Sequence, residues 1–162
     1  MFHASRVITP HQVLGQRPVR DTNCTITKIH PVLALLFGLG YNGPMKVYLN
    51  SIGCRLNQSE IETMARQLLA AGHEIVTDTA VADKVIINTC AVTAEAARDA
   101  RRQTRRIHRD NPTAEIVLTG CYATIAPDEL AQVEGAGRVV VNQQKAQLVQ
   151  LLDPQARLDL PM

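Results

Sequence analysis

The sequence is poor in aromatic residues and cysteine and has little net charge. Tryptophan is absent and aromatic residues make up 3% of the 162-residue chain, so the core must come from Val, Ile, Leu and Ala. Four cysteines, none in a C-x-x-C pair, are too few for a disulfide scaffold at this length. A formal net charge of +2 does not by itself argue for nucleic acid. What remains is one ordinary globular domain, because 46% hydrophobic residues are enough for a core.

Patterns for membrane insertion, export and nucleotide binding are also missing. The longest apolar stretch, residues 31–41, is far shorter than the roughly 20 residues that a membrane span needs, and no small-x-small cleavage pattern follows it. No G-x-G-x-x-G or G-x-x-x-x-G-K-S/T loop follows an expected strand, so nucleotide binding through those motifs is not supported. We therefore expect a cytoplasmic protein with no membrane segment.

The chain divides into three parts by composition. Residues 1–44 have scattered Pro and His and no sustained periodicity, which is typical of a poorly ordered extension. Residues 45–152 carry regular apolar patterns and form the expected domain, and residues 153–162 are a tail or a truncated linker. Cys24 lies in the extension and is not placed in any site.

Strand and helix patterns alternate through the expected domain. Asn57 and Glu60 have capping-box spacing at the start of the first helix, and Gly72 ends it. Expected strands cover residues 45–50, 74–77, 84–88, 115–119 and 138–141, and expected helices cover residues 57–71, 93–109, a segment from Pro127, and 143–152. This alternation predicts a small doubly wound α/β domain, flavodoxin- or Rossmann-like, with a parallel sheet and helices on both faces.

Two of these helices have a predicted inward face. In the helix over residues 93–109 the small face is Ala97, Ala100, Thr104 and Ile107. In the closing helix the inward residues are Leu148, Leu151 and Leu152.

Three of the expected strands run directly into a cysteine. Val47 to Gly53 leads to Cys54, Val85 to Thr89 leads to Cys90, and Ile116 to Gly120 leads to Cys121. Parallel strands end at one edge of a sheet, and open α/β folds bind ligands at that edge. The three thiols are therefore expected to converge on one crevice.

Thiolates are soft ligands that select zinc, copper(I) or iron–sulfur clusters. A structural zinc site favours four ligands and close C-x-x-C knuckles, which are lacking. A 4Fe-4S cluster is ordinarily held by four cysteines, so three would leave one iron open to an exogenous ligand. A single cysteine after a strand is more often a core residue, but three in matching positions, two of them after Gly53 and Gly120, favour a ligand set.

Other side chains fit catalysis less well. His73 and His108 do not follow a cysteine-bearing strand, so a cysteine–histidine nucleophile ranks low. Asp78 and Asp83 are interpreted as loop-solvating residues and not as an acid/base pair.

Arginines crowd the segment expected to form the second long helix. They are Arg98, Arg101, Arg102, Arg105, Arg106 and Arg109. One interpretation is a solvated helix face, and the other is contact with RNA phosphates by Arg98, Arg101, Arg102 and Arg105. The sequence leaves both open.

Three sequence blocks resemble a known family. MKVYLNSIGCRLNQSE (45–60), INTCAVT (87–93) and LTGCYA (118–123) are similar to the N-terminal domain of the radical SAM methylthiotransferases. The first block is most like the tRNA enzymes that methylthiolate N6-threonylcarbamoyladenosine at position 37. Val141 departs from the family pattern, which commonly has glycine before the asparagine.

This resemblance implies a function for the three thiols. Cys54, Cys90 and Cys121 would hold an auxiliary 4Fe-4S cluster whose open iron carries the sulfur to be transferred. SAM would enter through a radical SAM domain, and the partner of the full enzyme would be a tRNA anticodon arm.

The family's C-x-x-x-C-x-x-C motif is absent, so we expect a domain of an enzyme that is inactive alone. The alternative is a cluster-free, flavodoxin-like module for protein docking or RNA binding.

Overall fold

A computed structural model describes residues 6–7 and 44–154. Their strands are β1 (Arg6–Val7), β2 (Lys46–Ser51), β3 (Glu74–Val76), β4 (Lys84–Thr89), β5 (Glu115–Gly120) and β6 (Arg138–Val140). The α-helices are α3 (Arg55–Ala70), α4 (Ala94–Asp110), α5 (Cys121–Ile125), α6 (Pro127–Ala131) and α7 (Leu148–Leu152). Two 3₁₀ segments are η1 (Thr79–Val81) and η2 (Asn142–Gln147). Cys24 and most of the expected extension, with residues 155–162 of the expected tail, lie outside the described residues.

The five strands of residues 44–154 form a parallel sheet in the order β3-β2-β4-β5-β6. This order confirms the predicted doubly wound fold and is that of flavodoxin-like proteins. The short β1 pairs antiparallel with the end of β2, opposite Asn50 and Ser51. Among the described residues, no helix is both long and apolar enough to cross a membrane.

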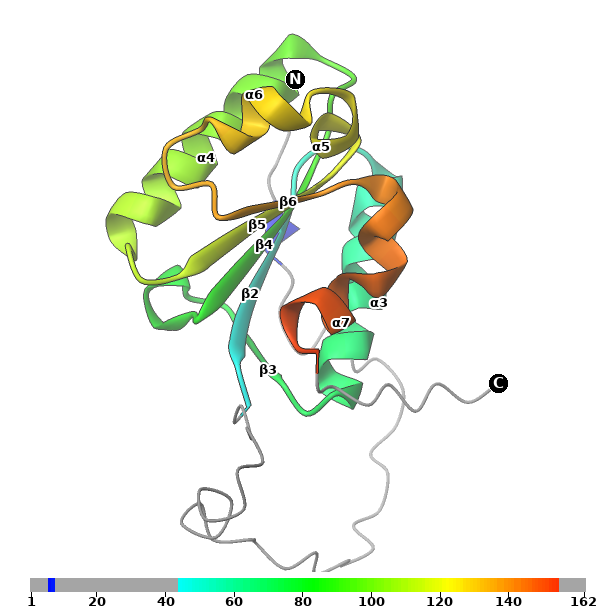
Figure 1. The fold of residues 1–162 in the computed structure, drawn as a ribbon, viewed down its shortest axis with the longest axis vertical. Coiled ribbons are helices and arrows are strands. Elements are labelled where there is room, and N and C mark those ends of the chain that lie inside the picture. The colour runs from blue at the N-terminus through cyan, green and yellow to red at the C-terminus, as the bar shows by residue number, and fades with distance from the viewer. Residues whose placement is uncertain (1–5, 8–43, 155–162) are drawn as a thin grey trace, which may run out of the picture.

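Helices cover both faces of the sheet, with α4, α5 and α6 on one side and α3 and α7 on the other (Figure 1). Successive strand residues point to opposite faces, so Val85 and Ile87 pack toward α4 while Ile86 packs toward α3. The strands are buried on both faces, which explains their unbroken apolar sequences.

Helix boundaries correct some sequence expectations. The first helix begins at Arg55, with Cys54 in the extended cap position, so Asn57 is a buried residue of its first turn and not its cap. The reason is that the Asn57 side chain donates to the Ile52 carbonyl and closes the turn that precedes the helix. The helix end was predicted correctly, since Gly72 follows it with φ +86°.

The inward faces of two helices also differ from expectation. In α4 the predicted inward residues Ala100, Thr104 and Ile107 are buried, but the fourth buried residue is Ala96, while Ala97 is partly buried. The closing segment is not one helix, because η2 precedes α7. Since α7 starts at Leu148, the buried residues are Leu148, Val149 and Leu152, and Leu151 is 38% exposed.

Glycine is required at Gly120, the last residue of β5. Its φ is +101°, and a Cβ there would lie 2.3 Å from the Thr89 carbonyl oxygen. Val141, by contrast, has φ −72° and ψ 160°, which any residue adopts, so this chain needs no glycine before Asn142.

Gly120→Ala is expected to destabilise the fold more than Gly72→Ala. Both glycines have positive φ, but nothing lies within 4 Å of a Cβ at Gly72. The Gly72→Ala variant therefore measures only the cost of holding alanine at positive φ, about 1 kcal/mol of unfolding free energy. In Gly120→Ala the added Cβ also contacts the backbone of β4. The free energy of unfolding is therefore expected to fall by roughly 3 kcal/mol or more. Urea unfolding measures the stability of both variants. An equal loss of unfolding free energy in the two would contradict close packing between the ends of β4 and β5.

Candidate metal centre at the strand ends

The cysteine-bearing strands are neighbours in the sheet. Ser51 of β2 pairs with Asn88 of β4, and Thr89 of β4 pairs with Gly120 of β5. Adjacent strands lie about 4.8 Å apart, so the three turns leave one edge side by side. The change in strand order falls between β2 and β4, because β3 lies on one side of β2 and β4 on the other. The edge at which we predict a crevice is therefore the topological switch point of the sheet.

Two turns press directly against the end of β4. At Gly53, with φ +113°, an added Cβ would lie 2.3 Å from Cys90 Cβ and 2.9 Å from its Sγ. The turn that carries Cys54 therefore packs on the Cys90 side chain. On the other side of β4, Gly120 packs on the Thr89 backbone, one residue before Cys121. Both glycines have the positive φ of a tight turn, and the neighbour that each one approaches is protein. Their close approach to a ligand stays a prediction.

The three thiols differ in exposure. Cys54 is exposed at the start of α3, Cys90 is 4% exposed, and Cys121 is intermediate as the first residue of α5. All three are free, and the described residues contain no fourth cysteine. The short helix that begins at Cys121 was not among the helices expected from the sequence. An exogenous group would therefore approach past Cys54, while Cys90 faces the packed interior.

The thiols do not form a site for a single metal ion. Within residues 6–7 and 44–154, no three His, Cys, Asp or Glu side chains lie close enough together to bind one. A cubane cluster is several ångströms across and is held by thiolates. The donor chemistry and the shared sheet edge fit such a cluster better than a mononuclear zinc site.

A buried polar network lies beneath the Cys54 turn. Asn57 is 1% exposed; its Nδ2 donates to the Ile52 carbonyl at 3.0 Å, and its Oδ1 accepts from Cys54 Sγ at 3.7 Å. Asn88, fully buried, donates from Nδ2 to the Asn57 carbonyl at 2.9 Å. A Cβ at Gly120 would lie 2.5 Å from Asn88 Oδ1. Two asparagines thus connect the turn of Cys54 to the turn of Cys121.

Glu60 and Lys145 close this network from the α3 side. Lys145 Nζ of η2 donates to Glu60 Oε2 at 2.8 Å, and Asn88 Nδ2 donates to the same oxygen at 3.0 Å. Burial alone raises the pKa of Glu60. The hydrogen bonds from Lys145 and Asn88, together with the lysine charge, outweigh burial and hold that pKa below its ordinary value.

The sequence did not identify these network residues as part of the site. The spacing of Asn57 and Glu60 indicates a capping box, and the sequence around Lys145 has no pattern that predicts a site. The available signal was Asn88, an amide inside a strand that is otherwise apolar. A buried amide must find partners, so it indicates a polar network.

The histidines and aspartates lie in structural positions. His73 Nδ1 accepts from the Met45 amide at 3.4 Å, and its Nε2 lies 3.5 Å from Asp153 Oδ2. Met45 precedes β2, so His73 is at the opposite end of the sheet from the cysteines. Burial lowers the pKa of His73 even though the Asp153 carboxylate opposes that effect. His108 packs against Gly135.

Both aspartates bind backbone amides. Asp78 accepts from the Ala80 amide at 2.9 Å, and Asp83 accepts from the Lys46 amide at 2.8 Å. These bonds hold the loop between β3 and β4, so both carboxylates have a structural role.

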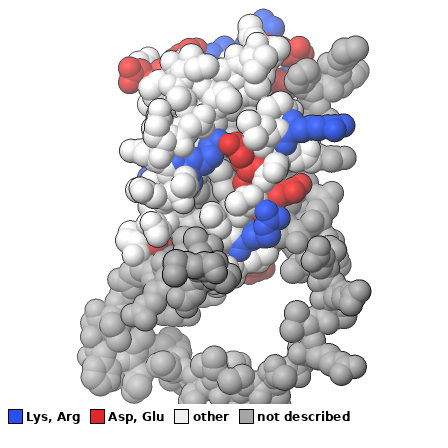
Figure 2. Space-filling view, turned by 90° about the vertical axis from the view of Figure 1, so that its right-hand side faces the viewer, with Lys and Arg blue, Asp and Glu red and all other residues white. Residues whose placement is uncertain are grey.

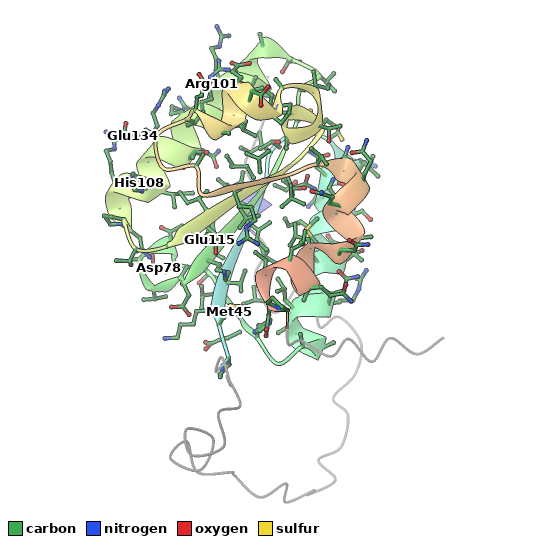
Figure 3. The ribbon with its side chains drawn as sticks, in the orientation of Figure 1. Met45, Asp78, Arg101, His108, Glu115 and Glu134 are labelled. Atoms are coloured by element: carbon green, nitrogen blue, oxygen red, sulfur yellow. The ribbon has the colours of Figure 1, made fainter. Side chains whose placement is uncertain are left out.

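The arginines of α4 separate into bound and exposed groups. Arg101 contacts the Tyr122 hydroxyl and lies 2.5 Å from Glu129 Oε1, and its guanidinium lies over the Tyr122 ring. Arg98, Arg102 and Arg105 are exposed. Figure 3 shows Arg101 at the α6 side of α4.

Lys145→Met is expected to cost stability mainly above about pH 4.5. Because the folded pKa of Glu60 is below its ordinary value of 4.5, its ionised form stabilises the fold above that pH, and the contribution is lost as the pH falls through the folded pKa. The difference in unfolding free energy from the native chain should shrink in acid. Lys46→Met, an exposed lysine with no ion pair among the described residues, is the control. A pH-independent difference would contradict the assigned Glu60 contact.

Comparisons with known proteins support one family. Residues 46–142, more than half of the chain, match the profile described as Uncharacterized protein family UPF0004. The threonylcarbamoyladenosine tRNA methylthiotransferase MtaB of Aquifex aeolicus is 38% identical over 67% of this chain and 27% of its own length. The enzyme of that name from Chlamydia pneumoniae is 40% identical over 61% of this chain and 24% of its own.

A relative with a different named substrate also matches. The ribosomal protein uS12 methylthiotransferase RimO of Chloroflexus aurantiacus is 29% identical over 73% of this chain and 26% of its own length. The chain therefore spans about a quarter of the length of these relatives. The matched region includes Cys54, Cys90 and Cys121. The chain belongs to the UPF0004 family, the N-terminal domain of the methylthiotransferases.

Proposed function

We propose that residues 45–152 are the sulfur-donating domain of a tRNA methylthiotransferase that modifies N6-threonylcarbamoyladenosine at position 37. Support comes from the family, from the names of the relatives, and from three free cysteines at the ends of adjacent parallel strands. The last observation carries the proposal, because a docking module has no need to place three thiols at one sheet edge.

Cys54, Cys90 and Cys121 are the residues that would hold the 4Fe-4S cluster. When bound, the cluster would supply an iron that the three thiolates leave open, and that iron would bind the sulfur to be transferred. Glycines at two turns let the cysteine-bearing loops pack closely on β4, which supports a shared position for the three thiols at this sheet edge.

The surrounding side chains have separate roles in this proposal. Cys90 is enclosed by the α4-side core, which excludes water from one side of the site. Cys54 is exposed and leaves the other side open to the group that accepts sulfur. Asn57 and Asn88 fix the turns between them through buried hydrogen bonds. The chain's own contribution is to position the thiols, to shield one side and to leave an entrance.

The rest of the reaction needs groups outside this domain. SAM would bind to a radical SAM domain, which the family carries in the remaining length of its enzymes. The substrate would be the anticodon arm of a tRNA, as the names of the MtaB relatives suggest. The comparisons do not favour the alternative of a cluster-free docking module, because the relatives are named as methylthiotransferases.

Anaerobic reconstitution with iron and sulfide tests the proposal. We expect about four iron and four sulfide per chain, with a visible absorption band, and a loss of most of that content in Cys54→Ala, Cys90→Ala and Cys121→Ala. Cys24→Ala is the matched control, since it removes a thiol that follows no strand pattern.

Two results would overturn this function. The first is negligible iron in the native chain under conditions that load a known cluster protein. The second is equal iron content in all four variants, which would show adventitious binding. Circular dichroism of each apo variant verifies that a loss of iron does not reflect unfolding.

A further inference from the structure

Helix α4 carries a continuous stripe of arginines on its exposed side. Arg98, Arg102, Arg105 and Arg109 follow one another at spacings of four, three and four residues, and all four are exposed. Residues at these spacings lie on one helix face, and the stripe extends for about 16 Å. We call these four residues the arginine stripe.

Two arginines of α4 outside the stripe form ion pairs within the domain. Arg101 is bound to Tyr122 and Glu129, and Arg106 Nε lies 3.6 Å from Asp110 Oδ2. Within the stripe, Arg102 pairs with Asp99 on the same helix. Among the described residues, Arg98, Arg105 and Arg109 form no ion pair. Their charges are therefore available to a partner.

The stripe lines a hollow on the surface. The hollow has a volume of about 470 Å³ and is lined by the stripe together with Arg101 and Glu134. Figure 3 shows Glu134 and His108 on the α4 side of the molecule. Gly135 packs against His108, which fixes this loop beside the helix. Arg101 and Arg102 are paired with Glu129 and Asp99, so three arginines without an ion pair among the described residues face the one carboxylate of Glu134, and the hollow is positive.

One end of the arginine stripe lies near the end of α4 that follows Cys90. Thr93 caps α4 three residues after Cys90, and the Thr93 side chain accepts from the Ala96 amide at 3.1 Å. Arg98 is the stripe member nearest that end, and Arg109 is farthest from it. A polyanion lying along α4 would therefore lead toward the edge where the cysteines lie.

We propose that the arginine stripe binds the phosphate backbone of the substrate RNA and guides it toward the cysteine edge. Guanidinium groups bind phosphate oxygens in pairs of hydrogen bonds, and the stripe is made entirely of arginine. Contacts of this kind set position and do not read sequence. The choice of RNA over an acidic protein rests on the proposed function.

The opposite face of the sheet has a different charge pattern. Figure 2 shows the side of the molecule that carries α3 and α7, where basic and acidic groups lie next to one another. Lys145 there is paired with Glu60, and Arg138 with Glu115. Exposed Arg66 of α3 donates to Thr63 Oγ1. Arg66 is therefore a control of the same residue type outside the stripe.

The test is the salt dependence of binding between the whole apo chain and an anticodon stem-loop RNA. The logarithm of the association constant falls with the logarithm of salt concentration by about 0.7–0.9 for each phosphate contact. We expect Arg105→Ala to reduce that slope by this amount and Arg98→Ala/Arg105→Ala by about twice as much. Arg66→Ala should leave the slope unchanged.

Several outcomes would overturn the stripe assignment. Equal slopes for Arg105→Ala and Arg66→Ala would show that the stripe does not contact phosphate. Competition by polyglutamate as strong as that by RNA at equal charge would indicate an acidic protein as the partner. Because the apo chain is used, this result does not depend on whether the cysteines take up iron.

Discussion

The end of β4 is the position on which the candidate site depends. Cys90 occupies the space beside Gly53, and the Thr89 backbone lies where a side chain at Gly120 would project. The neighbouring strands β2 and β5 therefore have to turn within contact distance of β4. This packing, and not any direct bond between sulfurs, is what brings the turns of Cys54 and Cys121 to either side of Cys90.

Much of this arrangement could be predicted from the sequence. Apolar strands such as Val85–Thr89 are recognisable because burial on both faces removes the usual alternation. Once the strands are parallel, topology places Cys54, Cys90 and Cys121 at one edge. The network beneath them could not be predicted, because the contacts of Asn88 with Asn57 and Glu60 join residues about thirty positions apart.

Short sequence patterns did not predict the roles of residues whose side chains bind distant parts of the chain. Asn57 and Glu60 have capping-box spacing, yet their side chains serve the Ile52 carbonyl and the Lys145–Asn88 cluster. The arginines of α4 show the same limit. Their periodicity was visible, but only the positions of Tyr122 and Glu129 distinguish structural Arg101 from the exposed stripe. The sequence alone does not tell which arginines form ion pairs within the domain and which are exposed, because that depends on the residues that pack beside α4.

We propose that three thiolates hold one cluster and leave one iron open. Mössbauer spectroscopy of the chain reconstituted with ⁵⁷Fe tests it most directly, because each iron reports its own ligands. We expect one 4Fe-4S cluster per chain in which a single iron responds to an added small thiolate while the other three do not. A spectrum of mononuclear iron, or four irons that are all indifferent to the added thiolate, would contradict it.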